Sequence, residues 1–262
     1  YVSVRNIDGN VERAAASLGA PPLQVLLLID VPLLAPGLFG GWLFAAIAMA
    51  ALWRWHLHLR KAGLAEAASP LVTAALAVIF ANTGDGASVH SSAIAWMIGT
   101  WGARLGVYLL WDEVLERPAT PGLREPIWLF ERRALDALFF ALPALLASFN
   151  PATALSTVEL GTAAVWLVAF TGETTADRQF VRWRRSRTPL TDAPEPGTVI
   201  DADVCRVGVW RYVPYAHEVF ELVTWIAHAA FVWTSPFGWT AVACPLAVAY
   251  RVATGGTRRA QL

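Results

Sequence analysis

The sequence has few charged residues, few cysteines and a single lysine, Lys61. Only 15% of its 262 residues are charged, whereas a soluble domain of this size typically has about 25%. Two cysteines are too few for a disulfide framework. A formal net charge of zero gives no indication of a nucleic-acid partner. These scarcities exclude an ordinary soluble globule, a disordered chain and a disulfide-rich secreted module.

Apolar residues are abundant instead: 56% of the chain is hydrophobic and 13 residues are Trp. Several uncharged stretches approach or reach the length of about 20 residues that a helix needs to cross a bilayer. The expected spans are 22–36, 37–53, 66–82, 92–111, 134–150, 157–176, 214–233 and 238–252. The sequence therefore predicts an all-α, multi-spanning membrane protein of about seven transmembrane helices.

The organisation of the first spans is the least regular part of the pattern. A single helix over 22–53 would be about 48 Å long, longer than the apolar core of about 30 Å. We therefore expect a break near Pro36 and Gly37, with 22–36 either spanning or re-entering. Residues 1–21 are expected to be an N-terminal extension, and 1–262 a single integral membrane domain.

Basic residues are distributed unevenly between the connecting segments. Arg and Lys gather at 54–65, at 112–133, at 177–213 and at the C-terminus. The alternating loops 83–91, 151–156 and 234–238 contain neither residue. This distribution follows the positive-inside rule. It predicts that the basic loops and the C-terminus lie on the cytoplasmic side, or on the matrix or stromal side of an organelle.

Ionisable side chains within or beside apolar spans are costly and are therefore functional candidates. Glu173 and Asp177 are four residues apart, and Arg184 follows at seven more, so all three lie near one helix face. Such a set can hold a ligand that bears a phosphate or an amide. The alternative is a helix end that neutralises its own charges.

Histidines form a second group of candidates. His217, Glu221 and His228 also share one helix face, which suits a cofactor pocket, a proton relay, or a metal or haem site. One helix cannot supply a whole metal site, so no metal is expected. His56 and His58 point to nearly opposite faces at a span end, and we expect them to be solvated.

Two stretches of the C-terminal half carry a family resemblance. GETTADRQF at 172–180 is followed by VCRVGVWRY at 204–212, and then by Glu221 and Trp225. This order resembles the steroid 5α-reductase superfamily, and most of all its bacterial branch, a domain family of unknown function. WGARLG at 101–106 is similar to the W-G-x-R-L stretch of that branch. The resemblance extends over about 25–252.

The resemblance implies a helical membrane fold of about seven spans, with an NADPH site built from cytosolic loops and span ends. It implies hydride transfer to a conjugated C=C bond of a lipophilic enone. Asp177 and Arg184 would contact the nucleotide, Glu221 would seat the nicotinamide amide, and Arg251 would lie near the phosphates. Carried over by position, the cofactor-binding residues are Glu173, Asp177, Gln179, Arg184, His217, Glu221 and Arg251. No catalytic residue is assigned.

The sequence departs from the family pattern R-H-P-N-Y-F-G-E, which here reads PYAHEVFE at 214–221. His217 replaces Asn, and Phe220 replaces a Gly whose backbone would lie close to its neighbours. If Phe220 and Tyr215 fill the space between 177–187 and 214–221, they leave no room for a cofactor.

These departures keep two hypotheses in balance. The first is an NADPH-dependent reductase with a lipophilic small-molecule substrate. The second is a non-catalytic accessory subunit that retains the reductase fold within a larger respiratory or photosynthetic membrane complex. A haem or quinone carrier that uses His217 and His228 is a third, weaker reading. The expected partners are accordingly membrane lipids, a lipophilic substrate and other membrane subunits, without nucleic acid.

Overall fold

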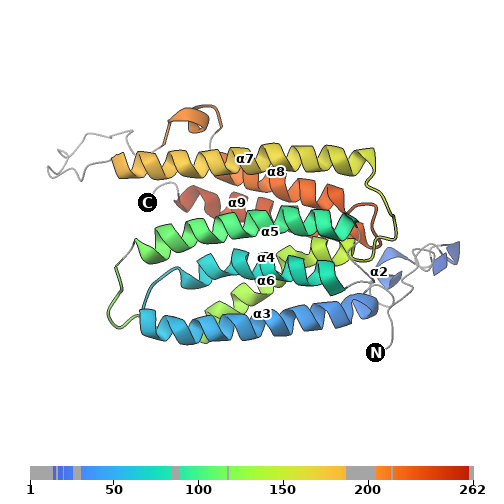
Figure 1. Ribbon diagram of the computed structural model, residues 1–262, viewed down its shortest axis with the longest axis horizontal. Coiled ribbons are helices and arrows are strands. Elements are labelled where there is room, and N and C mark those ends of the chain that lie inside the picture. The colour runs from blue at the N-terminus through green and yellow to red at the C-terminus, as the bar shows by residue number, and fades with distance from the viewer. Residues whose placement is uncertain are drawn as a thin grey trace. The chain divides into compact units, whose positions relative to one another are not determined.

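The structure is a computed structural model of the chain, shown in Figure 1. Every regular element in its described part is a helix, so the all-α prediction is confirmed. The chain folds into two compact units. Unit 1 comprises 1–157 and 231–241, and unit 2 comprises 158–230 and 242–262. The described residues are 14–15, 17–19, 21–25, 31–83, 89–116, 118–186, 205–213 and 215–259.

Unit 1 holds four long helices. They are α3 (Val31–Leu59), α4 (Leu64–Thr83), α5 (Val89–Leu109) and α6 (Ile127–Ala147), preceded by the single turn α2 (Pro22–Val25). A π-helical segment, η2 (Leu110–Leu115), extends α5. These helices correspond to the four expected spans between 37 and 150. Each helix begins or ends some residues away from the expected bounds, because polar residues at the ends are also helical.

The break expected near Pro36 is wrong, because α3 continues through Pro36 and Gly37 without interruption. Pro36 stands only five residues after the start of the helix, so it removes one backbone hydrogen bond close to the end, where few are formed. Gly37 lets α6 approach: a Cβ there would lie 2.8 Å from Cδ1 of Leu145. Residues 26–30 lie outside the described part, so the alternative of a spanning or re-entering 22–36 stays open.

Glycines also permit the close contact between α4 and α5. A Cβ on Gly102 would lie 2.3 Å from the carbonyl oxygen of Pro70, and one on Gly106 would lie 2.4 Å from Cγ of Leu71. Two glycines four residues apart present a flat strip on one helix face, which lets two membrane helices pack backbone to backbone. Shape complementarity and dispersion therefore contribute to the α4–α5 contact.

Unit 2 contains three long helices and one short turn. They are α7 (Thr157–Ser186), η4 (Gly208–Arg211), α8 (Ala216–Phe231) and α9 (Ala243–Arg259). The segment η5 (Gly238–Val242) precedes α9 in the chain, and its residues 238–241 belong to unit 1. Helix α7 contains the expected span 157–176 and continues as the basic extension predicted from DRQFVRWRRS. Most of the proline-rich part of the 177–213 segment, 187–204, lies outside the described residues.

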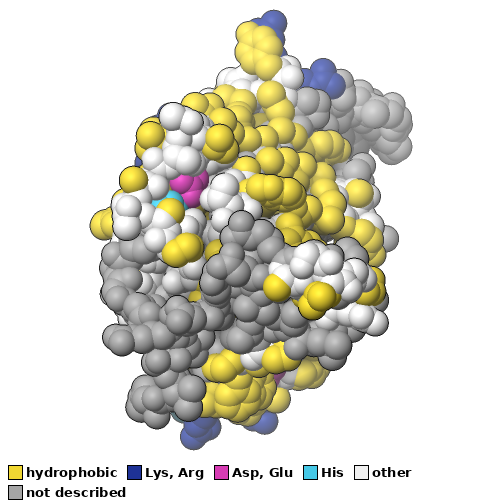
Figure 2. Space-filling view, turned by 90° about the vertical axis from the view of Figure 1, so that its right-hand side faces the viewer, with side chains coloured by type: hydrophobic (Ala, Val, Ile, Leu, Met, Phe, Trp, Pro, Cys, Tyr) yellow, Lys and Arg dark blue, Asp and Glu magenta, His cyan; other side chains and the backbone are white. Residues whose placement is uncertain are grey.

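The surface supports integration into a membrane. Leu34–Leu59, Leu64–Asn82 and Val89–Asp112 are each long and apolar enough to cross a bilayer. Large apolar side chains such as Ile47, Trp96 and Val168 are more than half exposed, and hydrophobic side chains form much of the described surface in Figure 2. Such extensive apolar exposure is stable in contact with lipid rather than with water. Which side of the membrane the basic loops occupy stays a prediction.

Candidate cofactor site in unit 2

A short turn after the undescribed loop is fastened to α7. The backbone N–H of Val209 donates to Oε1 of Gln179 at 2.8 Å, and Nε1–H of Trp210 donates to the carbonyl oxygen of Ala176 at 3.0 Å. Gly208 makes the turn possible because its φ is +60°, and because a Cβ would lie 2.5 Å from the Gln179 amide. Gln179, one of the residues implied by the resemblance, thus positions the G-V-W-R turn.

His217 lies on the other side of the same turn. Its ring packs on Trp210 with centroids 5.1 Å apart, and its Nε2 lies 3.9 Å from Oε1 of Glu218. Tyr215 adopts a φ of +55° just before α8 and so sets the angle at which the chain enters the helix. Nδ1 of His217 is buried and has no hydrogen-bond partner among the described residues. This atom is available to a ligand.

Phe220 occupies the contact between α7 and α8. A Cβ on Gly172 would lie 2.5 Å from Cε1 of the Phe220 ring. The ring packs against an apolar cluster that includes Ala176 and Trp210. Tyr215, in contrast, is 37% exposed and is not part of this cluster. Of the two side chains expected to close the site, Phe220 is the one in the cluster.

Glu221 and Arg251 form an ion pair between α8 and α9. Nη2 of Arg251 donates to Oε1 of Glu221, whose side chain is mostly buried, while the Arg251 side chain is half exposed. The resemblance assigns these residues to the nicotinamide and to the phosphates. In this structure the charges of the two residues neutralise each other. For either residue to bind a ligand, the ion pair has to open or the ligand has to bond to both residues at once.

The remaining predicted residues lie on α7. Glu173 is buried, and Asp177 and Arg184 are half-buried. The contacts around Trp210 bring Gln179 and His217 to one turn, and Phe220 against Gly172 brings the adjacent Glu221 to the level of Glu173. All seven residues therefore belong to unit 2, on α7, α8 and α9. Their role in cofactor binding stays a prediction.

Trp166 and Thr224, which lie beside His228, were not predicted from the sequence. The His228 imidazole is fully buried. Its ring centroid lies 4.9 Å from that of Trp225, in an edge-to-face contact, and 6.4 Å from that of Trp166. Thr224, one turn before His228 on α8, is also fully buried. Its position seven residues after His217 places it on the polar face already identified, which is the signal that could have found it.

The expectation that His56 is solvated is wrong, although His58 is exposed as expected. The His56 ring is completely buried at the end of α3. Its Nε2 accepts from the backbone N–H of Glu125 at 3.1 Å, so its Nδ1–H donates to the carbonyl oxygen of Lys61 at 3.1 Å. Trp53 Nε1–H donates to the carbonyl oxygen of Glu125 at 3.0 Å. The loop before α6 is thereby fastened to α3.

Charged groups surround this junction in unit 1. Nη2 of Arg133 donates to Oε1 of Glu66 at 2.6 Å, joining α6 to α4. Burial raises the pKa of the Glu125 carboxyl above its ordinary value of 4.5, with smaller opposing effects from the neighbouring His56, which lowers this pKa, and Glu66, which raises it. The Glu125 carboxylate is 3.9 Å from Nδ1 of His56. The junction combines hydrogen bonds to the backbone with a carboxyl group whose pKa is raised by burial.

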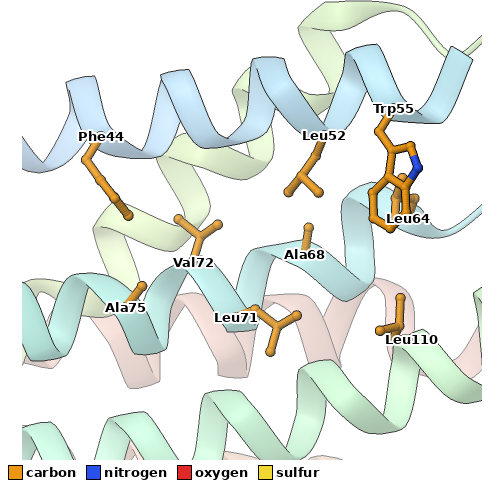
Figure 3. Close-up of a pocket in the computed structure, with 9 residues that line it drawn as sticks. All are labelled: Phe44, Leu52, Trp55, Leu64, Ala68, Leu71, Val72, Ala75 and Leu110. Atoms are coloured by element: carbon orange, nitrogen blue, oxygen red, sulfur yellow. The ribbon is translucent and has the colours of Figure 1, made fainter.

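An apolar pocket of about 200 Å³ opens between α3 and α4 in unit 1. Figure 3 shows Phe44, Leu52 and Trp55 of α3 facing Ala68 and Val72 of α4 across it. Its walls carry no charged group, so the pocket suits an apolar chain and not the reacting end of a polar molecule. No group of side chains that could hold a metal ion occurs among the described residues of either unit.

The family of the chain follows from the match over most of its length. Residues 52–259 match a family described as "Protein of unknown function (DUF1295)". The chain belongs to this family. No solved structure matches it.

The curated relatives cover much less. A putrescine transport system permease protein, PotI, is 43% identical over 42 residues, in Escherichia coli K12 and in Escherichia coli O6:H1. This similarity covers 16% of the chain and 15% of each permease. A segment this short does not define the architecture of the family match.

Proposed function

We propose that this member of the DUF1295 family is an NADPH-dependent membrane reductase of the steroid 5α-reductase type. It reduces a conjugated C=C bond of a lipophilic enone. One observation carries the proposal: Gln179 of α7 and His217 of α8 both contact the Gly208–Arg211 turn. The resemblance assigns these distant residues to a single cofactor site, and their meeting in unit 2 supports that assignment.

The side chains of the site fit a phosphorylated nucleotide. The guanidinium groups of Arg184 and Arg251 are suited to phosphate oxygens. The buried Nδ1 of His217, which has no protein partner in the described part of the chain, can hydrogen-bond to an amide or a sugar hydroxyl. Arg251 is half exposed and an ion pair of this kind is weak, so its guanidinium can exchange Glu221 for a phosphate at modest cost.

When bound, NADPH supplies a hydride for the β-carbon of the enone, and a proton from water completes the reduction at the α-carbon. The residues of the chain have three tasks in this mechanism. Arg184 and Arg251 hold the phosphates, and Glu221 orients the nicotinamide amide. The apolar faces of the helices exclude water, so the bound groups are held close together in a medium where their charges interact strongly.

NADPH binding tests the proposal directly. The full chain in phosphatidylcholine nanodiscs is titrated with NADPH, whose own fluorescence reports binding. We expect wild-type protein to change the emission, and Asp177→Ala or Arg184→Ala to weaken binding by about tenfold or more, since each removes a charge-assisted hydrogen bond. Arg182→Ala is the matched control, because Arg182 lies on the same helix and is exposed. A wild-type protein that leaves NADPH emission unchanged contradicts the proposal.

A second function is favoured by the packing of Phe220 against Gly172. The ring occupies the space where the family pattern has glycine, which suits an accessory subunit that has kept the fold and lost the cofactor. Phe220→Gly separates the two functions. If the ring closes a remnant site, the variant binds NADPH and the wild type does not. Stable co-purification of the wild type with a respiratory or photosynthetic complex supports the accessory role.

A further inference from the structure

A cluster of polar atoms lies inside unit 2, away from the turn that holds Gln179 and His217. Both ring nitrogens of His228 are buried without a hydrogen-bond partner among the described residues. A neutral imidazole has one donor and one acceptor nitrogen. Burying such atoms without a hydrogen-bond partner is unfavourable. A buried imidazole in an apolar helix therefore indicates that a bound molecule supplies the missing hydrogen bonds.

Thr224 contributes a second group to the cluster. Threonines in a helix usually donate the hydroxyl to the carbonyl oxygen of the preceding turn, as Thr174 and Thr175 of α7 do at 2.7 Å. The buried Oγ1 of Thr224 makes no such bond within the described part of the chain. Thr224 is four residues before His228, so the two side chains lie on the same face of α8.

Trp166 adds a third group from α7. Its ring faces His228 with centroids 6.4 Å apart, and its Nε1–H is buried with no acceptor in the residues described. Indole nitrogen is a donor only, and the threonine hydroxyl and one imidazole nitrogen can donate as well. Three donors from two helices thus occur in one apolar region. The chemical complement of such a set is an uncharged oxygen acceptor.

We propose that Thr224, His228 and Trp166 bind the carbonyl oxygen of the lipophilic enone. This inference rests on the proposed reductase function and names the residues that position its substrate. Hydrogen bonds to the carbonyl draw electron density from the conjugated C=C bond and so make its β-carbon a better hydride acceptor. A phosphate or carboxylate is a poorer ligand here, because none of the three side chains carries a fixed positive charge.

The test compares two probes that differ in the carbonyl group alone. Full-length protein in phosphatidylcholine nanodiscs is titrated with cholest-4-en-3-one, labelled with ¹³C at the carbonyl, and with cholest-4-ene. We expect the enone to bind about tenfold more tightly, and its isotope-edited infrared carbonyl band to move to lower frequency. Thr224→Val and His228→Phe should each weaken enone binding by about tenfold and reverse the band shift, leaving cholest-4-ene binding unchanged.

Thr171→Val is the matched control, because Thr171 is exposed and donates to the carbonyl oxygen of Leu167 in its own helix. It should leave both affinities unchanged. Thr224→Val is nearly isosteric, and it should not lower the thermal unfolding midpoint of the ligand-free protein, which separates binding from folding. Equal affinities of the wild type for the two probes overturn the inference. An unshifted carbonyl band of the bound enone also overturns it, because the three donors would then bind water and not the probe.

Measuring NADPH binding on the same samples distinguishes the inference from the function on which it rests. A carbonyl shift without NADPH binding supports the oxygen site and rejects the reductase. NADPH binding with no carbonyl shift supports the reductase and rejects the oxygen site. Loss of the shift in Thr224→Val, with NADPH affinity unchanged, assigns Thr224 to substrate positioning.

Discussion

The backbone N–H of Glu125 donates to Nε2 of His56, 69 residues earlier in the chain. A backbone nitrogen can only donate, so this bond fixes the imidazole as the neutral Nδ1–H tautomer. The same ring then satisfies the carbonyl oxygen of Lys61. His56 therefore serves as a two-sided connector between the end of α3 and the loop before α6.

Replacing His56 should destabilise unit 1. His56→Phe preserves an aromatic ring next to Phe130, whose centroid is 5.6 Å from that of His56, but it removes the hydrogen bonds of the ring to the Glu125 N–H and to the Lys61 carbonyl. We expect a loss of about 2 kcal/mol in the free energy of unfolding, measured by denaturant titration in detergent. His58→Phe, at an exposed position, should change it little. Equal stability of both variants and the wild type contradicts the connector role.

Glu125 should make stability depend on pH. Its pKa is raised in the folded protein above the ordinary value of 4.5, so the folded state holds a proton that the unfolded state has released. This contribution to stability is present at low pH and is lost as the pH rises through 4.5 and then through the raised pKa. Glu125→Gln should remove this contribution. Between pH 4 and pH 7, the thermal unfolding midpoint of the variant should therefore shift less in favour of pH 4 than that of the wild type.

The contact of Gly172 with Phe220 predicts a strong dependence on side-chain size. Gly172→Ala places a Cβ about 2.5 Å from the ring, and we expect a destabilisation of about 1–3 kcal/mol. Gly161→Ala on the same helix meets nothing within 4 Å and should be neutral or stabilising. In a Phe220→Leu background the cost of Gly172→Ala should fall. An unchanged cost in that background shows that the ring is not the obstacle.

The Glu221–Arg251 pair should stabilise unit 2 only modestly. Arg251 is half exposed, so a double-mutant cycle of Glu221→Gln and Arg251→Gln should give a coupling energy of about 0.5–1 kcal/mol that declines with added salt. Thermal unfolding of the four proteins at two ionic strengths measures it. A coupling near zero would mean that neither residue is held by the other, and that both are free for a ligand.

The positions of the helices were predictable where an uncharged run is unbroken. The expected span 66–82 corresponds closely to α4, because no charged residue follows Glu66 in this helix. The expected break at Pro36 failed because the prediction used helix length and proline chemistry alone. The contacts that keep α3 continuous, of Gly37 with Leu145 and of Gly41 with Phe80, join residues far apart in sequence.

The candidate site was predictable residue by residue, but its internal contacts were not. Helical spacing placed His217, Glu221 and His228 on one face, and the resemblance added Gln179 and Arg251. The pairing of Glu221 with Arg251 depends on how α8 meets α9, which spacing within one helix does not encode. The burial of His56 was missed for the same reason, since its partner Glu125 comes from a distant loop.

The glycine strip on α5 bears on the order in which the protein is made. Gly102 and Gly106 let α4 and α5 meet backbone to backbone, and only a short connection separates these helices in the sequence. Both are complete before any residue of α6 has been synthesised. The pair can therefore enter the bilayer as a preassembled hairpin, on which α6 later docks through Thr73 and Ala137, whose side-chain hydroxyl and carbonyl oxygen lie 3.4 Å apart. A bulky residue at either glycine would then be felt first during biosynthesis, as a failure of insertion.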